Sequence, residues 1–244
     1  MMSLEEENLF KLVETWNRDN LDLAMELVQG NRQLLKALKS RYHKVLRLLP
    51  KGSTLYDLTG QSLHINRKNR QPLKFEEKLV PIFNSLPFTS LLLENASYVP
   101  WWVEEMSALD ELDIYHGLWM ESEQPTNLGK LKQLNSLTLT KVETLPKSIA
   151  SVVSLIHLVI ENVRYVELPE VIGNCALLKE LKVIDCSRVK IPRSLAQCSL
   201  LEEVVIKDTS VVYWPKNMDG LPEACELSIW HDYYYGDTSM EYYE

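Results

Sequence analysis

Residues 145–183 read LPKSIASVVSLIHLVIENVRYVELPEVIGNCALLKELKV and contain one pattern twice, 23 residues apart. Each copy opens with Leu-Pro-x-x-Ile, at Leu145 and again at Leu168, and closes with Leu-x-x-Leu-x-[Ile/Val]. The alternating apolar residues of the closing half predict a strand with one buried face. Because proline fixes φ and lacks a backbone donor, the opening half predicts a turn into a short helical return.

The same unit recurs along most of the chain. An earlier, degenerate copy contains Gly60, Leu63 and Ile65. Six prolines each stand nine residues before the next strand segment, a spacing that chance rarely produces. The predicted strand segments begin at Phe88, Leu109, Leu134, Leu155, Leu178, Leu201 and Ala224, and the prolines are Pro100, Pro125, Pro146, Pro169, Pro192 and Pro215. Units of this length predict a solenoid in which each unit stacks on its neighbours.

This pattern resembles the leucine-rich repeat family over roughly residues 60–231. The Leu-Pro-x-x-Ile segments are most similar to its intracellular subtype, and the compact form with irregular units resembles bacterial members. The resemblance implies an α/β fold: a right-handed leucine-rich repeat solenoid with a parallel sheet on the concave face and short helical or irregular returns outside. It also implies a function in protein binding.

The chain departs from the family at the turn after each strand. Most members carry Asn or Cys there, and its side chain hydrogen-bonds the backbone of the turn. This chain has Ala96, Gly117, Val142, Val163, Cys186 and Thr209 at those positions, of which only the last two can make such bonds. Because buried backbone donors need partners, we expect an irregular or slightly distorted solenoid.

The first 50 residues have helical rather than strand periodicity. Ser3 and Glu6 form a capping-box pattern that opens a first helix, whose apolar stripe includes Trp16. A second helix is expected to begin after Asn20 and to end at Gly30, and a third to end before Pro50. The sequence therefore predicts an element of three helices.

One repeat cannot bury enough apolar surface to fold alone, so the ends of the array need caps. We expect residues 1–50 to form an α-helical N-terminal cap and residues 51–231 to form about seven or eight repeats. Residues 232–244 are acidic and rich in tyrosine, and we expect them to form a C-terminal tail or cap.

Composition and charge narrow the possible functions. The 244 residues include 26 Lys and Arg against 34 Asp and Glu, a net charge of −8, which disfavours nucleic acid as the main partner. The acidic N-terminus lacks the features of a secretory signal, and no apolar run is long enough to span a membrane. The four cysteines have no metal-site spacing and are interpreted as reduced core thiols. A cytoplasmic protein is expected.

Residues between the core positions of each strand should face outward on the concave side of the sheet. Eight strands about 4.8 Å apart make a surface roughly 38 Å long, which suits a protein segment better than a metabolite. Exposed aliphatic and aromatic side chains among acids are typical of recognition surfaces. The predicted partner-binding residues are Leu92, Tyr115, His157, Val159, Glu161, Glu180, Lys182, Ile184, Val205 and Trp230.

The charges on this face indicate what kind of partner it would bind. Glu180, Glu203 and Glu226 form a ladder of like charges that would repel one another if unpaired. Lys182 and Lys207 can reach the ladder diagonally. The acidic balance favours a basic partner segment, although a solvated face with mixed residues and no partner is the simpler alternative.

Other functions have less support in the sequence. There is no phosphate-binding or dinucleotide-binding glycine motif, and the histidines come from different repeats, so we expect no enzyme activity, cofactor, metal or small-molecule substrate. The alternative function is a membrane-surface or nucleic-acid adaptor that acts through the basic helix at residues 32–51. We expect neither membrane nor nucleic acid to be the main partner.

Overall fold

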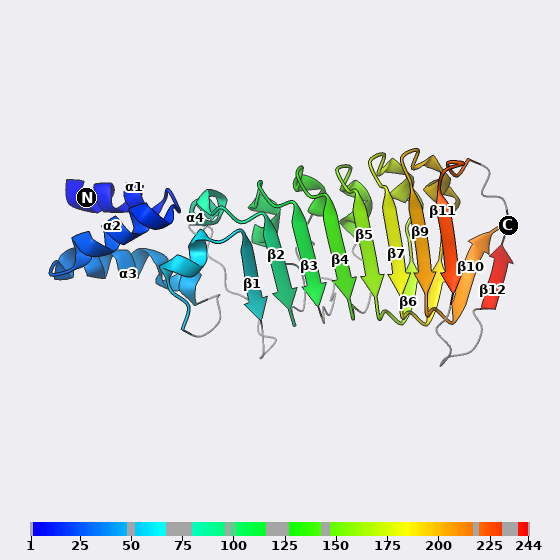
Figure 1. Cartoon of the computed structure of the whole chain (residues 1–244), viewed down its shortest axis with the longest axis horizontal. Helices are drawn as coiled ribbons and strands as arrows, with labels where there is room; N and C mark the ends of the chain where they lie inside the picture. The colour runs from blue at the N-terminus through cyan, green and yellow to red at the C-terminus, as the bar shows by residue number, and fades with distance from the viewer. Residues whose placement is uncertain are drawn as a thin grey trace.

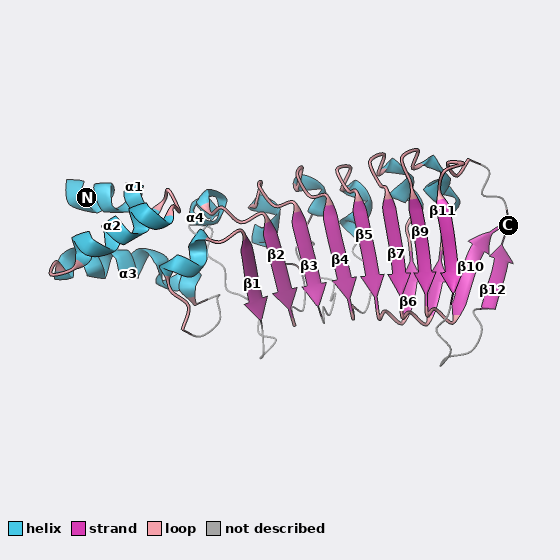
Figure 2. Cartoon of the chain, in the orientation of Figure 1, coloured by secondary structure: helices cyan, strands magenta, loops and turns pink. Residues whose placement is uncertain are grey.

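The computed structural model describes residues 2–47, 52–66, 80–95, 99, 101–115, 127–142, 147–216, 220–230 and 239–243. Helices lie at the N-terminal end, and a row of stacked coils leads from them to the C-terminus at the opposite end (Figure 1). Strands of the larger set form one side of every coil, a second and smaller set of strands lies in the C-terminal coils, and short helical returns lie along the side where the larger set begins (Figure 2). This arrangement is a leucine-rich repeat solenoid of the α/β class.

Eight parallel strands form the main sheet, as the repeat pattern predicted. Their order is β1-β2-β3-β4-β5-β7-β9-β11, so each strand pairs with the corresponding strand of the next coil. The degenerate copy near Gly60 supplies β1, which confirms it as the first strand of the array. The strands are β1 Ser62–Asn66, β2 Ser90–Glu94, β3 Glu111–Tyr115, β4 Ser136–Thr140, β5 His157–Glu161, β7 Glu180–Ile184, β9 Glu203–Lys207 and β11 Glu226–Trp230.

The second and fourth residues of these strands form the core. From β2 to β9 their side chains are buried, whereas the first, third and fifth residues are more exposed. One register runs through the whole sheet, so each buried residue lies beside its equivalent in the next coil, as Leu158 of β5 lies beside Leu181 of β7. The core is therefore a set of continuous aliphatic columns that no single coil could bury.

A second parallel sheet was not predicted from the sequence, which indicated only helical or irregular returns. Its strands run opposite to those of the main sheet (Figure 1). A Val-x-[Leu/Ile/Trp]-Pro motif follows each of β5, β7 and β9, as in Val166-Glu167-Leu168-Pro169, but a strand of three residues is too short for its alternation to be recognised. In the order β12-β10-β8-β6, the strands are Ser239–Tyr243, Val211–Pro215, Arg188–Lys190 and Tyr165–Glu167.

The helical returns follow the predicted prolines. The aliphatic residue three positions after each of the first five prolines is fully buried, as Ile149 and Ile172 are, whereas the sixth, Met218, lies outside the described residues. Neighbouring returns pack so closely that a Cβ on Gly173 would lie only 2.6 Å from the carbonyl oxygen of Ser194. The returns are 3-10 helices: η3 Trp101–Glu105, η4 Leu128–Lys130, η5 Lys147–Ser151, η6 Glu170–Asn174 and η7 Arg193–Gln197.

The turns after the main strands share a backbone conformation that was not predicted from the sequence. In five of them, the residue directly after the strand has a positive φ, and its N–H donates to the carbonyl of the last residue of the next strand at 2.8–3.0 Å. The expected distortion of the solenoid is not observed in the main sheet, where the register is unbroken. The five residues are Asn95, Lys141, Asn162, Asp185 and Asp208, with φ between 50° and 58°.

Three helices precede the solenoid: α1 Leu4–Val13, α2 Arg18–Val28 and α3 Arg32–Leu46. The predicted capping box opens α1, with the Ser3 N–H donating to Glu6 at 2.8 Å. Helix α2 begins two residues before Asn20 rather than after it, because Asn17 caps it by accepting the Asp19 N–H at 2.9 Å.

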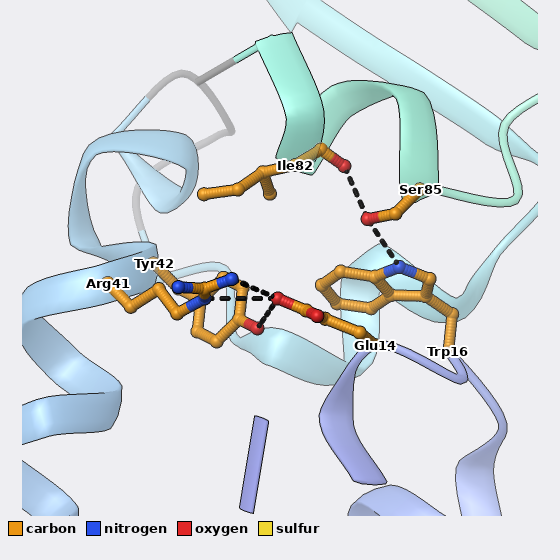
Figure 3. Close-up of polar contacts among 6 residues, drawn as sticks. All are labelled: Glu14, Trp16, Arg41, Tyr42, Ile82 and Ser85. Atoms are coloured by element: carbon orange, nitrogen blue, oxygen red, sulfur yellow. Dashed lines mark hydrogen bonds and ion pairs between the residues drawn. The ribbon is translucent and has the colours of Figure 1, made fainter. Parts of the chain in front are cut away.

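Polar contacts tie these helices to one another and to the first coil (Figure 3). Glu14 accepts hydrogen bonds from Arg41 Nε at 3.0 Å and from the Tyr42 hydroxyl at 3.2 Å. Burial, with the nearby carboxylate, raises the pKa of Tyr42 well above its ordinary value. Trp16, predicted to lie within the first helix, instead follows it with φ of 49°, and its indole N–H donates to the Ser85 hydroxyl at 3.2 Å. Ser85 ends the short helix α4, Val80–Ser85, just before the second main strand.

These contacts lead us to propose that the helical element is the N-terminal cap, and deletion of residues 1–49 tests this proposal. We expect the truncated chain to aggregate or to unfold over a broad temperature range, because the first coil would lose the cover that an end coil needs. Circular dichroism melting and light scattering measure both effects. A sharp melting transition equal to that of the full chain would refute the cap assignment.

The turn geometry predicts the effect of substitutions at Asn162. The substitution Asn162→Val should lower the free energy of unfolding by about 1–2 kcal/mol, because a β-branched residue at positive φ is strained. The matched control is Asn162→Gly: both substitutions lose the amide bond to Asp185 at 2.7 Å, but glycine adopts this conformation freely. The urea midpoints of the two variants should therefore differ clearly, and equal midpoints would contradict the proposed strain.

Candidate protein-binding face

The candidate site is the outer sheet face, defined as the side chains at the first, third and fifth positions of the eight main strands. The strand register places them in three straight columns that cross the sheet. In the central column, for example, Thr138, Val159 and Lys182 lie side by side on β4, β5 and β7. The sheet therefore holds the positions of these side chains at a regular spacing of about 4.8 Å.

All ten predicted partner-binding residues lie on the outer sheet face, but they do not form one cluster. Seven of them are contiguous on β5, β7 and β9: His157, Val159, Glu161, Glu180, Lys182, Ile184 and Val205. Leu92 and Tyr115 lie on β2 and β3, and Trp230 lies on the last main strand. The largest contiguous group of predicted residues therefore lies in the C-terminal half of the face.

Lys182 is the centre of an ionic network in this cluster. Its Nζ lies 2.5 Å from Oε1 of Glu180 and 3.6 Å from Oε2 of Glu203, so it reaches the acidic ladder as predicted. The hydrogen bond from Lys182 lowers the pKa of Glu180, and the same contact raises the pKa of Lys182. His157 adds to the network, with Nδ1 3.3 Å from Oε2 of Glu180. These contacts reduce the repulsion within the ladder.

The outer sheet face as a whole is acidic. Across its eight strands, seven carboxylates stand against two lysines, Lys182 and Lys207. The two lysines lie on the adjacent strands β7 and β9, two positions apart in the register, so the acidic excess extends along the rest of the sheet. The carboxylates are Glu94, Glu111, Asp113, Glu161, Glu180, Glu203 and Glu226.

Asp113 lies in the central column of the face, near two other acids. Burial raises its pKa, and the charges of Glu111 and Glu161 raise it further, against the effect of a hydrogen bond with Thr138. Desolvation and like charges both disfavour the carboxylate. A cation brought to this point by a partner would be stabilised by all three acids.

A lysine side chain lies over the ring of each of the two large aromatic residues of the face. Nζ of Lys207 lies 4.3 Å from the ring centroid of Trp230. Nζ of Lys141 lies 5.2 Å from the Tyr115 ring and 3.1 Å from its hydroxyl oxygen. Sequence reasoning missed Lys141, because only the positive-φ turn after β4 directs it back over β3. It also left out Asp113 and His64, although both lie in the central column of alternating positions.

The described part of the chain offers little for metal or thiol chemistry. No group of three or more His, Cys, Asp and Glu side chains among the described residues could hold a metal ion. Cys175, Cys186 and Cys198 are buried, and burial raises their pKa values to about 11. They are therefore protonated core residues near neutral pH. Among the helices described, none combines the length and apolarity that a membrane crossing needs.

No protein-family model and no curated protein matches the sequence. Among solved structures, the chain is similar to the plant peptide hormone receptor RGFR1 in complex with RGF2, with 17% identity and a TM-score of 0.46 over 72% of this chain and 33% of the receptor chain. Internalin C2 from Listeria monocytogenes shares 21% identity, with a TM-score of 0.47 over 63% of this chain and 66% of the internalin.

A third similar structure extends over nearly all of both chains. The leucine-rich repeat domain of the type III effector XopL has 13% identity and a TM-score of 0.43, over 94% of this chain and 96% of that domain. This chain therefore spans about a third of the plant receptor chain but almost the whole of the effector domain. At these identities, the similarity concerns the fold alone.

The raised pKa of Asp113 predicts that Asp113→Asn stabilises the protein near neutral pH. Because the pKa is higher in the folded than in the unfolded chain, ionisation of Asp113 favours unfolding. At pH values where Asp113 is ionised, the variant should melt about 1–3 °C higher than the wild type. This gain should disappear below roughly pH 4, where Asp113 is protonated in both the folded and the unfolded chain. Melting curves between pH 3 and pH 8 measure this effect. A lower melting temperature at pH 7 would contradict it.

Proposed function

We propose that this chain is a non-enzymatic protein-interaction module that binds a partner through the outer sheet face. The observation that carries the proposal is the combination on one face of an acidic excess with half-exposed aliphatic residues, Val159, Ile184 and Val205 among them. A solvated sheet face has no need of three such residues on adjacent strands. The partner that fits is a protein segment with basic and apolar side chains.

Each part of the face has a separate role in this proposal. The aliphatic residues of β5, β7 and β9 supply apolar area, which drives association when water is removed from it. The acids Glu111, Asp113 and Glu161 attract and orient cationic side chains, which affects the association rate and the choice of partner more than the affinity. Trp230 and Tyr115 are large, rigid side chains of the type found at binding hot spots.

We also propose a cytoplasmic location, an intracellular repeat type and a bacterial source. The Leu-Pro-x-x-Ile segments support the repeat type. The cysteines support the location, because all four are free and three are core residues, as in proteins of reducing compartments. The proposed division of the chain is a cap at residues 1–50, repeats at 51–231 and a tail at 232–244.

Helix α3 supports the second candidate function, binding to an anionic surface. Arg41 belongs to the basic helix predicted at residues 32–51. Its Cζ lies 4.5 Å from the centroid of the Phe10 ring, and this contact contributes to folding. Residues 48–51 lie outside the described part of the chain. Besides Arg41, four Lys and Arg residues are exposed along α3 and at its end: Arg32, Lys36, Lys39 and Arg47. The apolar stripe of α3 is buried, so any membrane or nucleic-acid contact would rest on charge alone.

Peptide display tests the main proposal, because selection from a random library needs no identified partner. A 16-residue phage library selected on the full chain should yield peptides that are rich in Lys, Arg and apolar residues. Binding of the enriched peptides, measured by fluorescence anisotropy, should weaken at least tenfold in the double variant Val159→Arg plus Ile184→Arg. Two added cations and the loss of apolar area both oppose such a peptide.

The matched control places the same substitutions on another side of the coils. Val153 follows η5, Val171 lies in η6, and both are 51% exposed, so Val153→Arg plus Val171→Arg adds the same charge and should keep the affinity. Equal binding by wild type and both double variants would reject the outer sheet face as the site. Enrichment of acidic peptides whose binding is lost in Lys36→Glu plus Lys39→Glu would instead favour the basic helix.

A further inference from the structure

The last coil leaves core positions uncovered. Leu227 on β11 is the equivalent of Leu158, Leu181 and Val204, which are fully buried, yet it is 45% exposed. In the second sheet, Tyr242 of β12 lies beside the buried Trp214 but is 61% exposed. Their neighbours Ile229 and Met240 are only partly buried. The C-terminal end of the solenoid is therefore an apolar surface built from residues that elsewhere form the core.

The same end carries two free sheet edges. Among the described residues, β11 pairs only with β9, and β12 pairs only with β10. The outer edge of each strand thus faces no other described strand, and an edge of this kind is a template for pairing with another chain. Both edges lie together at the C-terminal end, away from the helices (Figure 1).

The N-terminal end of the solenoid is closed. Leu63 and Ile65 of β1, which occupy the same core columns, are 3% and 1% exposed. Helices cover this end, and Trp16 links them to α4. Head-to-tail stacking of copies is therefore disfavoured, because the exposed core positions at the C-terminal end of one chain find only covered core positions at the N-terminal end of another. An interface that uses this surface on both chains closes after two copies.

We propose that the C-terminal end binds a second copy of this chain and forms an end-to-end dimer. A single twofold axis normal to both sheets sets β11 antiparallel to the partner's β11. The same axis sets β12 antiparallel to the partner's β12. Both sheets then continue from one chain into the other, and all four free edges are paired.

The sequence of β11 is compatible with pairing to itself. With Ser228 on the twofold axis, Leu227 lies opposite Ile229 of the partner subunit, so apolar core positions meet. Glu226 then lies opposite Trp230 of the partner subunit, so no like charges face each other along this strand pair. This proposal is independent of the outer sheet face, which remains exposed in both subunits.

Analytical ultracentrifugation of the full chain measures the proposed dimer. The mass should rise with concentration from 28.3 kDa toward twice that value. Leu227→Asp plus Tyr242→Asp should leave a monomer at concentrations where the wild type is dimeric. In the control, Leu23→Asp plus Leu27→Asp, two residues that are each 47% exposed on α2, the dimer should persist. A wild type that stays monomeric, or a dimer lost only in the control, would overturn the proposal.

A cysteine crosslink tests the arrangement and does not depend on destabilising substitutions. In a Cys225→Ser background, Ser228→Cys should form a disulfide-linked dimer under mild oxidation, because the two thiols meet at the twofold axis. The control Ser136→Cys, on β4 in the middle of the sheet, should stay monomeric on a non-reducing gel. Equal crosslinking of the two variants, or none with Ser228→Cys, would reject the end-to-end arrangement.

Discussion

The fold depends on one constraint: the core columns are buried only where one coil lies on another. Leu112, Leu137, Leu158 and Leu181 each fill the same place in successive coils, and each is covered by its neighbours on both sides. Because a coil cannot cover its own aliphatic residues, stability belongs to the array and not to any unit of it. The unbroken register of the main sheet follows, since a slip of one residue would expose a whole column.

The same alternation makes the outer sheet face available for binding. Packing fixes the second and fourth residues of each strand and leaves the first, third and fifth free to vary, so the chemistry of the face can change without loss of the fold. In this chain the free positions carry an acidic excess, and burial, followed by the charges of Glu111 and Glu161, raises the pKa of Asp113. The network of Lys182 with Glu180 and Glu203 reduces the repulsion between the acids of β7 and β9.

Period and spacing were enough to predict the main sheet, its core residues and the composition of the three columns. They did not predict the second sheet, because three-residue strands such as β6 and β8 contain too little alternation to recognise. Contacts that depend on the backbone conformation of one residue were also not predicted from the sequence. Trp16 has a positive φ and its indole contacts Ser85, and Lys141 has a positive φ and its side chain contacts Tyr115. The ten predicted partner-binding residues lie on the outer sheet face, where the register gathers seven of them on β5, β7 and β9, and their part in binding stays a prediction.

The two ends of the array show how the stacking constraint connects fold and function. A helical element covers Leu63 and Ile65 at one end, whereas Leu227 and Tyr242 at the other end are exposed, so the described core columns are open to association at the second end. That surface differs in chemistry from the acidic outer sheet face, and the two can be occupied at the same time. Joining two chains at this end would place two acidic faces on one continuous sheet. A partner with two basic segments could then bind both faces, and its second contact would form at high effective concentration.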